Sequence, residues 1–337
     1  MKAVAYQRSL PINHAESLVD INLPDPIATG RDLLVEVRAI SVNPVDVKKR
    51  TSIKPETQEW SVLGWDAAGV VRAVGPDVKM FKPGDRVWYA GSITRPGSNS
   101  ELQLVDERIV GNMPVSLDFS AAAALPLTSL TAWEMLFDRF AIPQRKSTNG
   151  QSLLIIGAAG GVGSIMTQLA RRLTNLTVIG TASRPETKEW VLQAGAHHVI
   201  DHTQHFGPQL DKIGVSNPDY IVSLTHTHQH FDQIAEVIAP QGKFGLIDDP
   251  EFFDIRKLKR KSVSLHWELM FTRSIFNTQD IAIQHNILNE ISTLVDKGII
   301  RTTAAENFGL INANNLKRAH ALLESGKSRG KIVLESF

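Results

Sequence analysis

The chain has 337 residues, and its 36 Lys and Arg against 35 Asp and Glu give a net charge of +1. This balance excludes the strongly basic character expected of nucleic-acid and anionic-membrane binders. The absence of cysteine excludes disulfides, thiolate catalysis and every cysteine-ligated metal site. The first residues lack the apolar core of a secretory signal, and no apolar run reaches the ~18 residues of a membrane span, so we expect a cytosolic protein.

Short apolar stretches separated by turn residues fill the N-terminal part of the chain. The segments 33–42, 67–75 and 82–91 have the composition of strands, and the last opens with a Pro-Gly-Asp turn. This pattern predicts a β-rich, barrel-like domain over residues 1–124.

From about residue 125 onward, strands and helices alternate. The strand that begins at residue 151 is followed by an amphipathic stretch with Ile165, Leu169 and Leu173 at helical spacing. Repetition of this unit predicts a doubly wound parallel sheet over residues 125–275. A long amphipathic helix over 280–298 then leads to strands that we expect to rejoin the first domain, so residues 276–337 complete it.

A cluster of small residues separates the strand at 151–156 from the following helix. It fits the dinucleotide fingerprint G-x-G-x-x-G, except that Ala158 replaces the first glycine. Backbone N–H groups at such a helix start bind a pyrophosphate. We expect the phosphate-binding backbone to be that of Ala159, Gly160, Gly161, Val162 and Gly163. The alternative is a glycine turn that serves packing alone.

The residues after the next strand indicate the type of cofactor. NAD sites carry an acidic residue about 20 positions beyond the fingerprint, whereas no Asp or Glu occurs between Gly157 and Pro185. Ser183, Arg184 and Lys188 stand there instead, and their donors suit a 2′-phosphate. We therefore expect NADPH. The alternative is that the two basic residues belong to a solvated helix start.

Several motifs together resemble the medium-chain dehydrogenase/reductase superfamily over nearly the whole chain. They are SVNPVDVKKR (41–50), LGWDAAGVVRAVG (63–75), FKPGDRVW (81–88), AAALPLTSLTAWEML (122–136), GAAGGVG (157–163) and GKIVL (330–334). The sequence is most similar to the quinone oxidoreductase branch and to the group called zinc-type alcohol dehydrogenase-like. The resemblance implies a GroES-like catalytic β-barrel domain, a Rossmann domain and a homodimer.

The same resemblance argues against zinc. Asn43 and Trp65 stand where zinc-dependent relatives carry metal ligands, and no cysteine is present for the remaining ligand. An amide and an indole do not replace thiolate and imidazole around Zn²⁺. We therefore expect no metal, and a reductase that transfers hydride from NADPH to a quinone or an α,β-unsaturated carbonyl. The alternatives are a zinc alcohol dehydrogenase with atypical ligands and a non-catalytic NADPH-binding protein.

Three residues of the first domain are candidates for the catalytic centre. By resemblance, the loop that carries Asn43 and Asp46 faces the nicotinamide, and Trp65 lines the substrate cleft. Asp46 has a structural alternative, which is to cap a helix that starts at Val47, and structural capping is also the alternative for Asn43. Trp65 has another, as a plain core residue.

The remaining candidates would contact the cofactor. Relatives present threonines such as Thr128 and Thr131 to it, and the alternative is helix capping or hydroxyl bonding within the helix. Thr225 and Ile247 follow strands at the ligand-binding edge of the sheet. Lys331 resembles basic residues that approach the cofactor in relatives, and its alternative is exposed surface charge.

Three histidines alternate along one segment, at positions 226, 228 and 230. In an extended segment they would share one side, as metal ligands can. However, we expect His230 to enter a helix, which breaks the alternation and favours a polar loop or a cofactor contact through His226.

Overall fold

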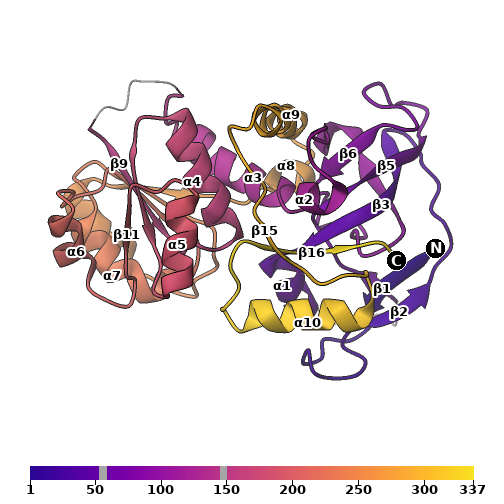
Figure 1. The fold of residues 1–337 in the computed structure, drawn as a ribbon, viewed down its shortest axis with the longest axis horizontal. Helices are drawn as coiled ribbons and strands as arrows, with labels where there is room; N and C mark the ends of the chain where they lie inside the picture. Colours follow the sequence, from indigo (N-terminus) through magenta and orange to yellow (C-terminus); the bar gives the residue numbers. More distant parts are fainter. Residues whose placement is uncertain (53–58, 145–149) are drawn as a thin grey trace. The chain divides into compact units, whose positions relative to one another are not determined.

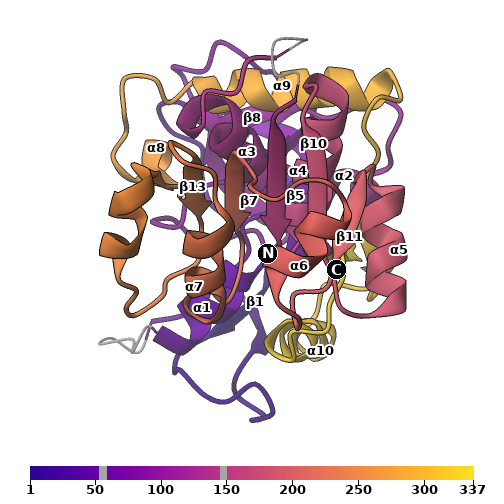
Figure 2. The same cartoon turned by 90° about the vertical axis from the view of Figure 1, so that its left-hand side faces the viewer.

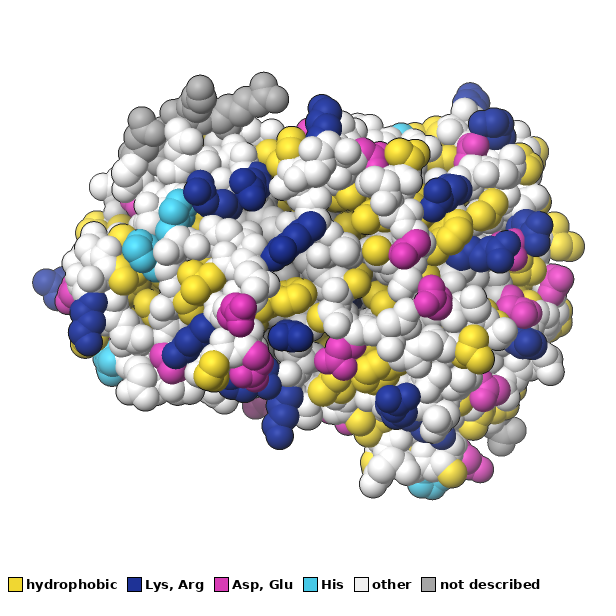
Figure 3. All heavy atoms as spheres, in the orientation of Figure 1, with side chains coloured by type: hydrophobic (Ala, Val, Ile, Leu, Met, Phe, Trp, Pro, Cys, Tyr) yellow, Lys and Arg dark blue, Asp and Glu magenta, His cyan; other side chains and the backbone are white. Residues whose placement is uncertain are grey.

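The computed structural model describes residues 1–52, 59–144 and 150–337. The chain divides into two compact units, one made of Met1–Leu130 with Phe271–Phe337 and the other of Thr131–Met270. Each unit has its own β-structure (Figure 1). Basic and acidic side chains are interspersed on the face drawn in Figure 3. Within the described residues, no helix has both the length and the apolar character needed to cross a membrane.

Antiparallel strands dominate the first unit. The larger sheet has the order β15 (Ala304–Asn307), β16 (Lys331–Glu335), β3 (Asp32–Val42), β5 (Ala67–Val74), β6 (Arg86–Tyr89), β8 (Val110–Asn112), with β7 (Leu102–Asp106) also paired to β3. The smaller sheet has the order β2 (Val19–Asn22), β1 (Lys2–Tyr6), β4 (Ser61–Val62). In the orders given, the first and last described strands of each sheet are not paired with each other, so the predicted β-barrel is not confirmed. Strands β15 and β16, which pair in parallel, join the larger sheet through β3.

The first unit also contains helical segments. They are α1 (Pro44–Ser52), η1 (Glu107–Ile109), α2 (Phe119–Ala123), α8 (Thr272–Ile275), α9 (Ile283–Asp296) and α10 (Ala313–Glu324), together with the start of α3 (Pro126–Trp133). Strand β3 alternates buried and partly exposed residues in its first half, as expected for a strand with one face on the core. Its last four residues are all buried, so β3 delivers Asn43 into the interior of the unit.

The second unit is built on a six-stranded parallel sheet. Its order is β11 (His198–Ile200), β10 (Thr177–Thr181), β9 (Ser152–Ile156), β12 (Tyr220–Ser223), β13 (Lys243–Leu246), β14 (Ser264–Trp267). Figures 1 and 2 show α4 (Gly161–Leu173) and α5 (Pro185–Gln193) on one face, with α6 (Phe206–Lys212) and α7 (Thr227–Val237) on the other. A π-helix, η2 (Glu134–Arg139), and a 3₁₀ segment, η3 (Ile255–Lys261), complete the unit.

Helices on both faces explain the sequence of the central strand. All five residues of β9 are buried, because a strand covered on both sides has no solvent-facing positions. Phe206 of α6 and Phe244 of β13 pack with Leu154 of β9 in the same core cluster. The α/β fold with a Rossmann-like parallel sheet, predicted from the alternating pattern, is confirmed. Because all strands run in parallel, their carboxyl ends meet at one edge.

Candidate functional site

The turn between β9 and α4 leaves backbone donors free for a ligand. Gly157 has a φ of +83°, a conformation that favours glycine, and it turns the chain immediately after the strand. Gly160 is the N-cap of α4 and has no side chain to accept from the first amides. Those amides have no partner within the helix, and the helix dipole favours an anion in front of them.

Close packing explains the other small residues of the turn. A Cβ on Gly163 would lie 2.5 Å from the Cα of Ala158, so only glycine lets α4 approach the strand end this closely. Ala158 itself is fully buried. The residues with positive φ include Gly157 but not Ala158, so alanine is accommodated at the first fingerprint position. The turn therefore matches the predicted architecture of a pyrophosphate site.

Three residues that the sequence analysis did not single out hold this turn in place. Thr181, at the end of β10, accepts a hydrogen bond from the Gly157 N–H at 3.0 Å. The Ser164 hydroxyl donates to the Gly160 carbonyl at 2.7 Å and accepts from the Trp190 indole at 2.7 Å. The signal in the sequence was a hydroxyl residue at a strand end and another in the first turn of the next helix.

The structure brings Thr225 and Ile247 to the same edge of the sheet as the glycine turn. The Thr225 Cγ2 lies 3.0 Å from the position that a Cβ on Gly157 would occupy, and its hydroxyl is 2.7 Å from the Nδ1 of His226. Ile247 follows β13, and its N–H donates to the Ser223 carbonyl at 3.4 Å. Both residues are therefore placed at the strand ends where ligands bind in such sheets.

The basic residues predicted for the 2′-phosphate also lie at this edge, next to carboxylates. Ser183 and Arg184 connect β10 to α5, and Arg184 lies 3.4 Å from Glu186. The Lys188 ammonium lies 3.3 Å from Asp201, which follows β11. All four charged groups are partly exposed, and ion pairs of this kind contribute little to stability. A phosphate dianion can therefore displace either carboxylate at low cost.

The histidine segment differs from an extended strand. Helix α7 begins at Thr227, so both His228 and His230 are helical, three residues earlier than we expected for the helix start. The alternation that suggested a shared metal face is therefore lost. Among residues 1–52, 59–144 and 150–337, no group of three or more histidine and carboxylate side chains is placed to hold a metal ion.

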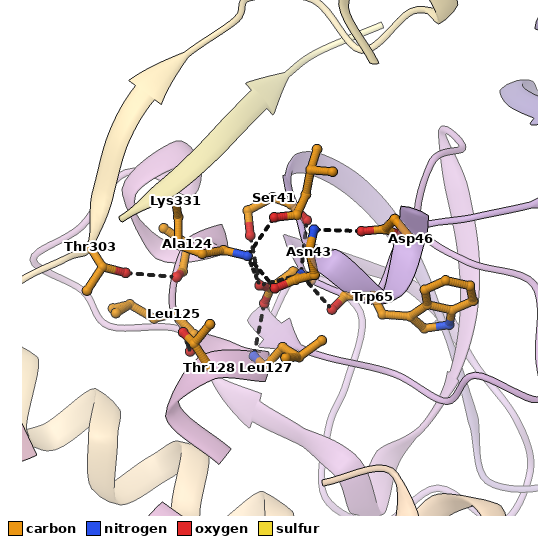
Figure 4. Close-up of polar contacts among 12 residues, drawn as sticks. Ser41, Asn43, Asp46, Trp65, Ala124, Leu125, Leu127, Thr128, Thr303 and Lys331 are labelled. Carbon is orange, nitrogen blue, oxygen red and sulfur yellow. Dashed lines mark hydrogen bonds and ion pairs between the residues drawn. The ribbon is translucent and has the colours of Figure 1, made fainter. Parts of the chain in front are cut away.

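A buried polar network forms the second candidate site, and it lies within the first unit (Figure 4). The Lys331 ammonium donates to the Oδ1 of Asn43 and, at 2.8 Å, to the Val42 carbonyl. The same nitrogen lies 3.3 Å from the Oδ2 of Asp66. The Asn43 amide donates to that carboxylate oxygen at 3.1 Å. Lys331 is 3% exposed, so its interpretation as surface charge is wrong.

Asp66 is the member of this network that sequence reasoning missed as a functional residue. It is fully buried and accepts from the Ser41 hydroxyl at 2.7 Å and from the Leu127 N–H at 3.1 Å. Burial raises the pKa of Asp66 and lowers that of Lys331, while the attraction between the two charges opposes both shifts. Hydrogen bonds to the carboxylate also favour its charged form, so the pair forms a buried ion pair.

Asp46 links two loops beside this network. Its Oδ2 accepts from the Asn43 N–H at 2.7 Å and its Oδ1 from the Gly64 N–H at 3.0 Å. Burial raises the pKa of Asp46 to about 7. The predicted helix start at Val47 is wrong, because α1 begins at Pro44 and Asp46 lies in its first turn. Asp46 nonetheless caps α1, because its carboxylate accepts a hydrogen bond from the N–H of Asn43, the residue just before the helix.

Two other predicted residues of this unit, Trp65 and Thr128, also bond internally. Trp65 is buried, and its indole N–H donates to the Ser92 carbonyl at 3.0 Å. The Thr128 hydroxyl donates to the carbonyl of Leu125, the residue just before α3, at 3.2 Å, which is a local bond of the kind named as the alternative for this residue. Thr131 lies further along the same helix and is buried. The contacts predicted for these residues with cofactor or substrate stay predictions.

Comparison with known proteins gives similarity over both units. Family models for the alcohol dehydrogenase GroES-like domain and for zinc-binding dehydrogenases match residues 29–114 and 194–334. A zinc-type alcohol dehydrogenase-like protein of Staphylococcus aureus is 40% identical over 336 residues, covering 99% of each chain.

Two solved structures extend this similarity to the fold. A Rhizobium etli protein, provisionally called a zinc-dependent alcohol dehydrogenase, is 57% identical with a TM-score of 0.96, over 100% of this chain and 98% of that one. The mycobacterial protein Rv1454c, solved in complex with NADPH, is 25% identical with a TM-score of 0.82, over 99% and 100% of the two chains.

Proposed function

Since the chain belongs to the medium-chain dehydrogenase/reductase superfamily, a family of oxidoreductases, we propose that it is an NADPH-dependent reductase that works without a metal. Its acceptor in this proposal is a quinone or an α,β-unsaturated carbonyl compound. The observation that carries the proposal is the edge of the parallel sheet, where the uncapped start of α4 and the basic residues Arg184 and Lys188 follow neighbouring strands.

The residues of this edge fit a dinucleotide phosphate. The amides of α4 supply donors for the pyrophosphate, and the absence of a side chain at Gly160 gives it room. Ser183, Arg184 and Lys188 supply a hydroxyl and two cations for a 2′-phosphate. The similarity to a mycobacterial protein that was solved with NADPH supports this choice of cofactor.

The residues that replace the zinc ligands of relatives do not fit zinc. The Asn43 carboxamide oxygen already accepts from the Lys331 ammonium, so a Zn²⁺ at that oxygen would lie beside a positive charge. The Trp65 indole has no lone pair to offer a metal, and its N–H donates to a carbonyl. We therefore propose that the reaction centre differs from that of the zinc enzymes whose family name it shares.

Reduction of a polarised acceptor suits a centre without a Lewis acid. When bound, NADPH supplies the hydride, and negative charge develops on the carbonyl oxygen of the acceptor. The chain aligns the two reactants, for which we assign Thr128, Thr131, Thr225 and Ile247 to the cofactor. Because the side chains of Asn43, Asp46 and Trp65 bond within the first unit, we give them a positioning role.

We further propose a homodimer formed through β14. This strand pairs only with β13 among the described strands, so its outer edge carries unpaired backbone groups. Trp267 and Leu269, next to that edge, are 52% and 51% exposed. Edge-to-edge pairing of two copies would bury both the backbone groups and these side chains. Light scattering of the purified protein tests this, and a monomer at micromolar concentration contradicts it.

A spectrophotometric screen tests the enzymatic proposal. NADPH oxidation is followed with quinones, enones, saturated aldehydes and ketones, each with and without a chelator, alongside metal analysis of the purified protein. We expect turnover with a quinone or an enone, unaffected by chelation, and substoichiometric zinc. Stoichiometric zinc with chelator-sensitive alcohol oxidation would favour a zinc dehydrogenase instead. Tight NADPH binding without turnover of any acceptor would favour a non-catalytic protein.

A further inference from the structure

Helix α3 begins without a local cap. Its first residue, Pro126, has no N–H, and the preceding residue, Leu125, has an apolar side chain that cannot accept a hydrogen bond. The first amide of the helix is therefore that of Leu127. This N–H donates to the Oδ1 of Asp66 at 3.1 Å, so the cap comes from a residue 61 positions earlier in the chain.

The contacts around Asp66 favour a charged carboxylate. Every group that contacts it is a donor: the hydroxyl of Ser41, the amide of Asn43, the N–H of Leu127 and the ammonium of Lys331. Four donors around one carboxyl group match the acceptor-only character of the ionised form. Lys331 is the cation of the network, and with its bonds to Val42 and Asn43 it is held in place from β3 (Figure 4).

We propose that Lys331 and Asp66 are a positioning pair, in which the ammonium keeps the Asp66 carboxylate charged so that it caps helix α3 and fixes Thr128 for the cofactor. The last clause rests on the proposed function, because that function assigns Thr128 to the cofactor. Neither residue needs to touch the cofactor. A carboxylate is the preferred partner for the positive end of a helix, and it binds an N–H more strongly than a neutral oxygen does.

Three variants test the pair: Lys331→Met, Lys331→Arg and the double variant Lys331→Met/Asp66→Asn. The readouts are hydrogen–deuterium exchange of the peptide carrying Leu127, the Kd for NADPH, and thermal stability. In Lys331→Met the carboxylate has lost its counter-charge, so we expect at least tenfold faster exchange at Leu127 and tenfold weaker NADPH binding. Lys331→Arg keeps the cation and is expected to recover part of both.

The double variant separates positioning from stability. It removes both charges, so we expect its thermal stability to exceed that of Lys331→Met. The amide oxygen that replaces the carboxylate is a weaker cap, so exchange at Leu127 stays faster and NADPH binding weaker than in the wild type. A folded double variant with wild-type exchange at Leu127 and wild-type NADPH affinity would overturn the proposal.

A second buried carboxylate in the same unit provides a matched control. Glu107 accepts from the N–H groups of Lys79 and Met80 at 2.8 and 2.7 Å, and it pairs with Arg31 at 2.7 Å. The variant Arg31→Met/Glu107→Gln should lower thermal stability while leaving Leu127 exchange and NADPH affinity within twofold of wild type. Equal effects from this control would show that the Lys331 variants act through general destabilisation, and would also overturn the proposal.

The same experiments keep the two proposals apart. If the wild-type protein does not bind NADPH, the proposed function fails, while exchange at Leu127 still decides whether Lys331 and Asp66 cap the helix. If the wild type binds NADPH and the Lys331 variants match it in affinity and exchange, the positioning pair alone fails.

Discussion

A Cβ built on Gly163 would stand 2.5 Å from the Cα of Ala158 and 2.5 Å from the carbonyl oxygen of Gly157. Both atoms belong to the backbone of the turn, so alanine at this position must push α4 away from the strand end. We expect Gly163→Ala to lower the free energy of unfolding by about 1–3 kcal/mol. We also expect at least tenfold weaker NADPH binding, measured by calorimetry, because the phosphate-binding amides move with the helix.

Gly160→Ala is the matched comparison. Gly160 has extended backbone angles, and the nearest atom to its added Cβ would be 3.5 Å away, so the fold accommodates the methyl group. We expect a stability loss below about 1 kcal/mol. If the pyrophosphate binds as proposed, the methyl group takes up space beside it, so we also expect weaker NADPH binding. Undiminished affinity in Gly160→Ala would place the pyrophosphate elsewhere.

Replacing Arg184 by alanine should change the preference between the two nicotinamide cofactors. A hydrogen bond to a charged group contributes about 1.5–3 kcal/mol, so we expect about 10- to 100-fold weaker NADPH binding. NADH lacks the 2′-phosphate, and its Kd should stay within twofold. Arg172→Ala, at the exposed far end of α4, is the control and should affect neither cofactor. Equal weakening of both cofactors by Arg184→Ala would remove this residue from the phosphate site.

The parallel sheet was predictable because its signals are local. The apolar run of β9, the small residues after it and the spacing of Ile165 and Leu169 occupy adjacent stretches of chain, so each element could be assigned from its own composition. The start of α1 is also encoded locally, since Pro44 suits a first helical position, but the prediction placed it at Val47 and missed this signal.

The network of Lys331 was not predictable in this way. Lys331 and its partner Asn43 are separated by 288 positions, and no local pattern distinguishes a buried lysine from a surface lysine in the segment SRGKIVL. Asp66 was equally ambiguous, because its role depends on accepting from Leu127 in another element. Buried ion pairs are defined by tertiary packing, and the local sequence around each residue does not show which distant residue it will contact.

Gly64 holds the loop that carries Trp65 and Asp66 in a conformation unfavourable for other residues. Its φ is +111°, its N–H donates to Asp46, and an added Cβ would lie 2.5 Å from the Oδ1 of Asn99. Gly84 has a φ of +93° with no atom within 4 Å of its added Cβ. We expect Gly84→Ala to cost about 1–2 kcal/mol from backbone strain alone, and Gly64→Ala to cost more because a clash is added.

Urea unfolding of the two glycine variants measures this difference. Equal losses would mean that the segment carrying Ser98 and Asn99 moves aside and that only the backbone conformation of Gly64 is constrained. A larger loss in Gly64→Ala, accompanied by altered fluorescence of the buried Trp65, would show that the clash displaces this loop.

Stability should fall as the pH rises, because of a buried carboxyl group in the second unit. Glu268 follows β14, is buried, and lies 2.8 Å from the Nε of Arg139. Burial and the neighbouring Glu134 raise its pKa from 4.5 to about 9, although Arg139 opposes the shift. Between these two values the folded protein retains a proton that the unfolded chain loses. The contribution of Glu268 to the free energy of unfolding is therefore complete below pH 4.5, and it is lost as the pH rises towards 9.

Glu268→Gln tests this directly, because glutamine stays neutral at every pH. We expect the Tm of the variant, relative to wild type, to rise steadily between pH 6 and pH 9, because each pH unit below the folded pKa costs the wild type up to about 1.4 kcal/mol. The exposed Glu251 provides the control, since Glu251→Gln should follow the wild type over the whole range. Parallel Tm profiles for wild type and Glu268→Gln would mean that Glu268 is already ionised at neutral pH, held by Arg139.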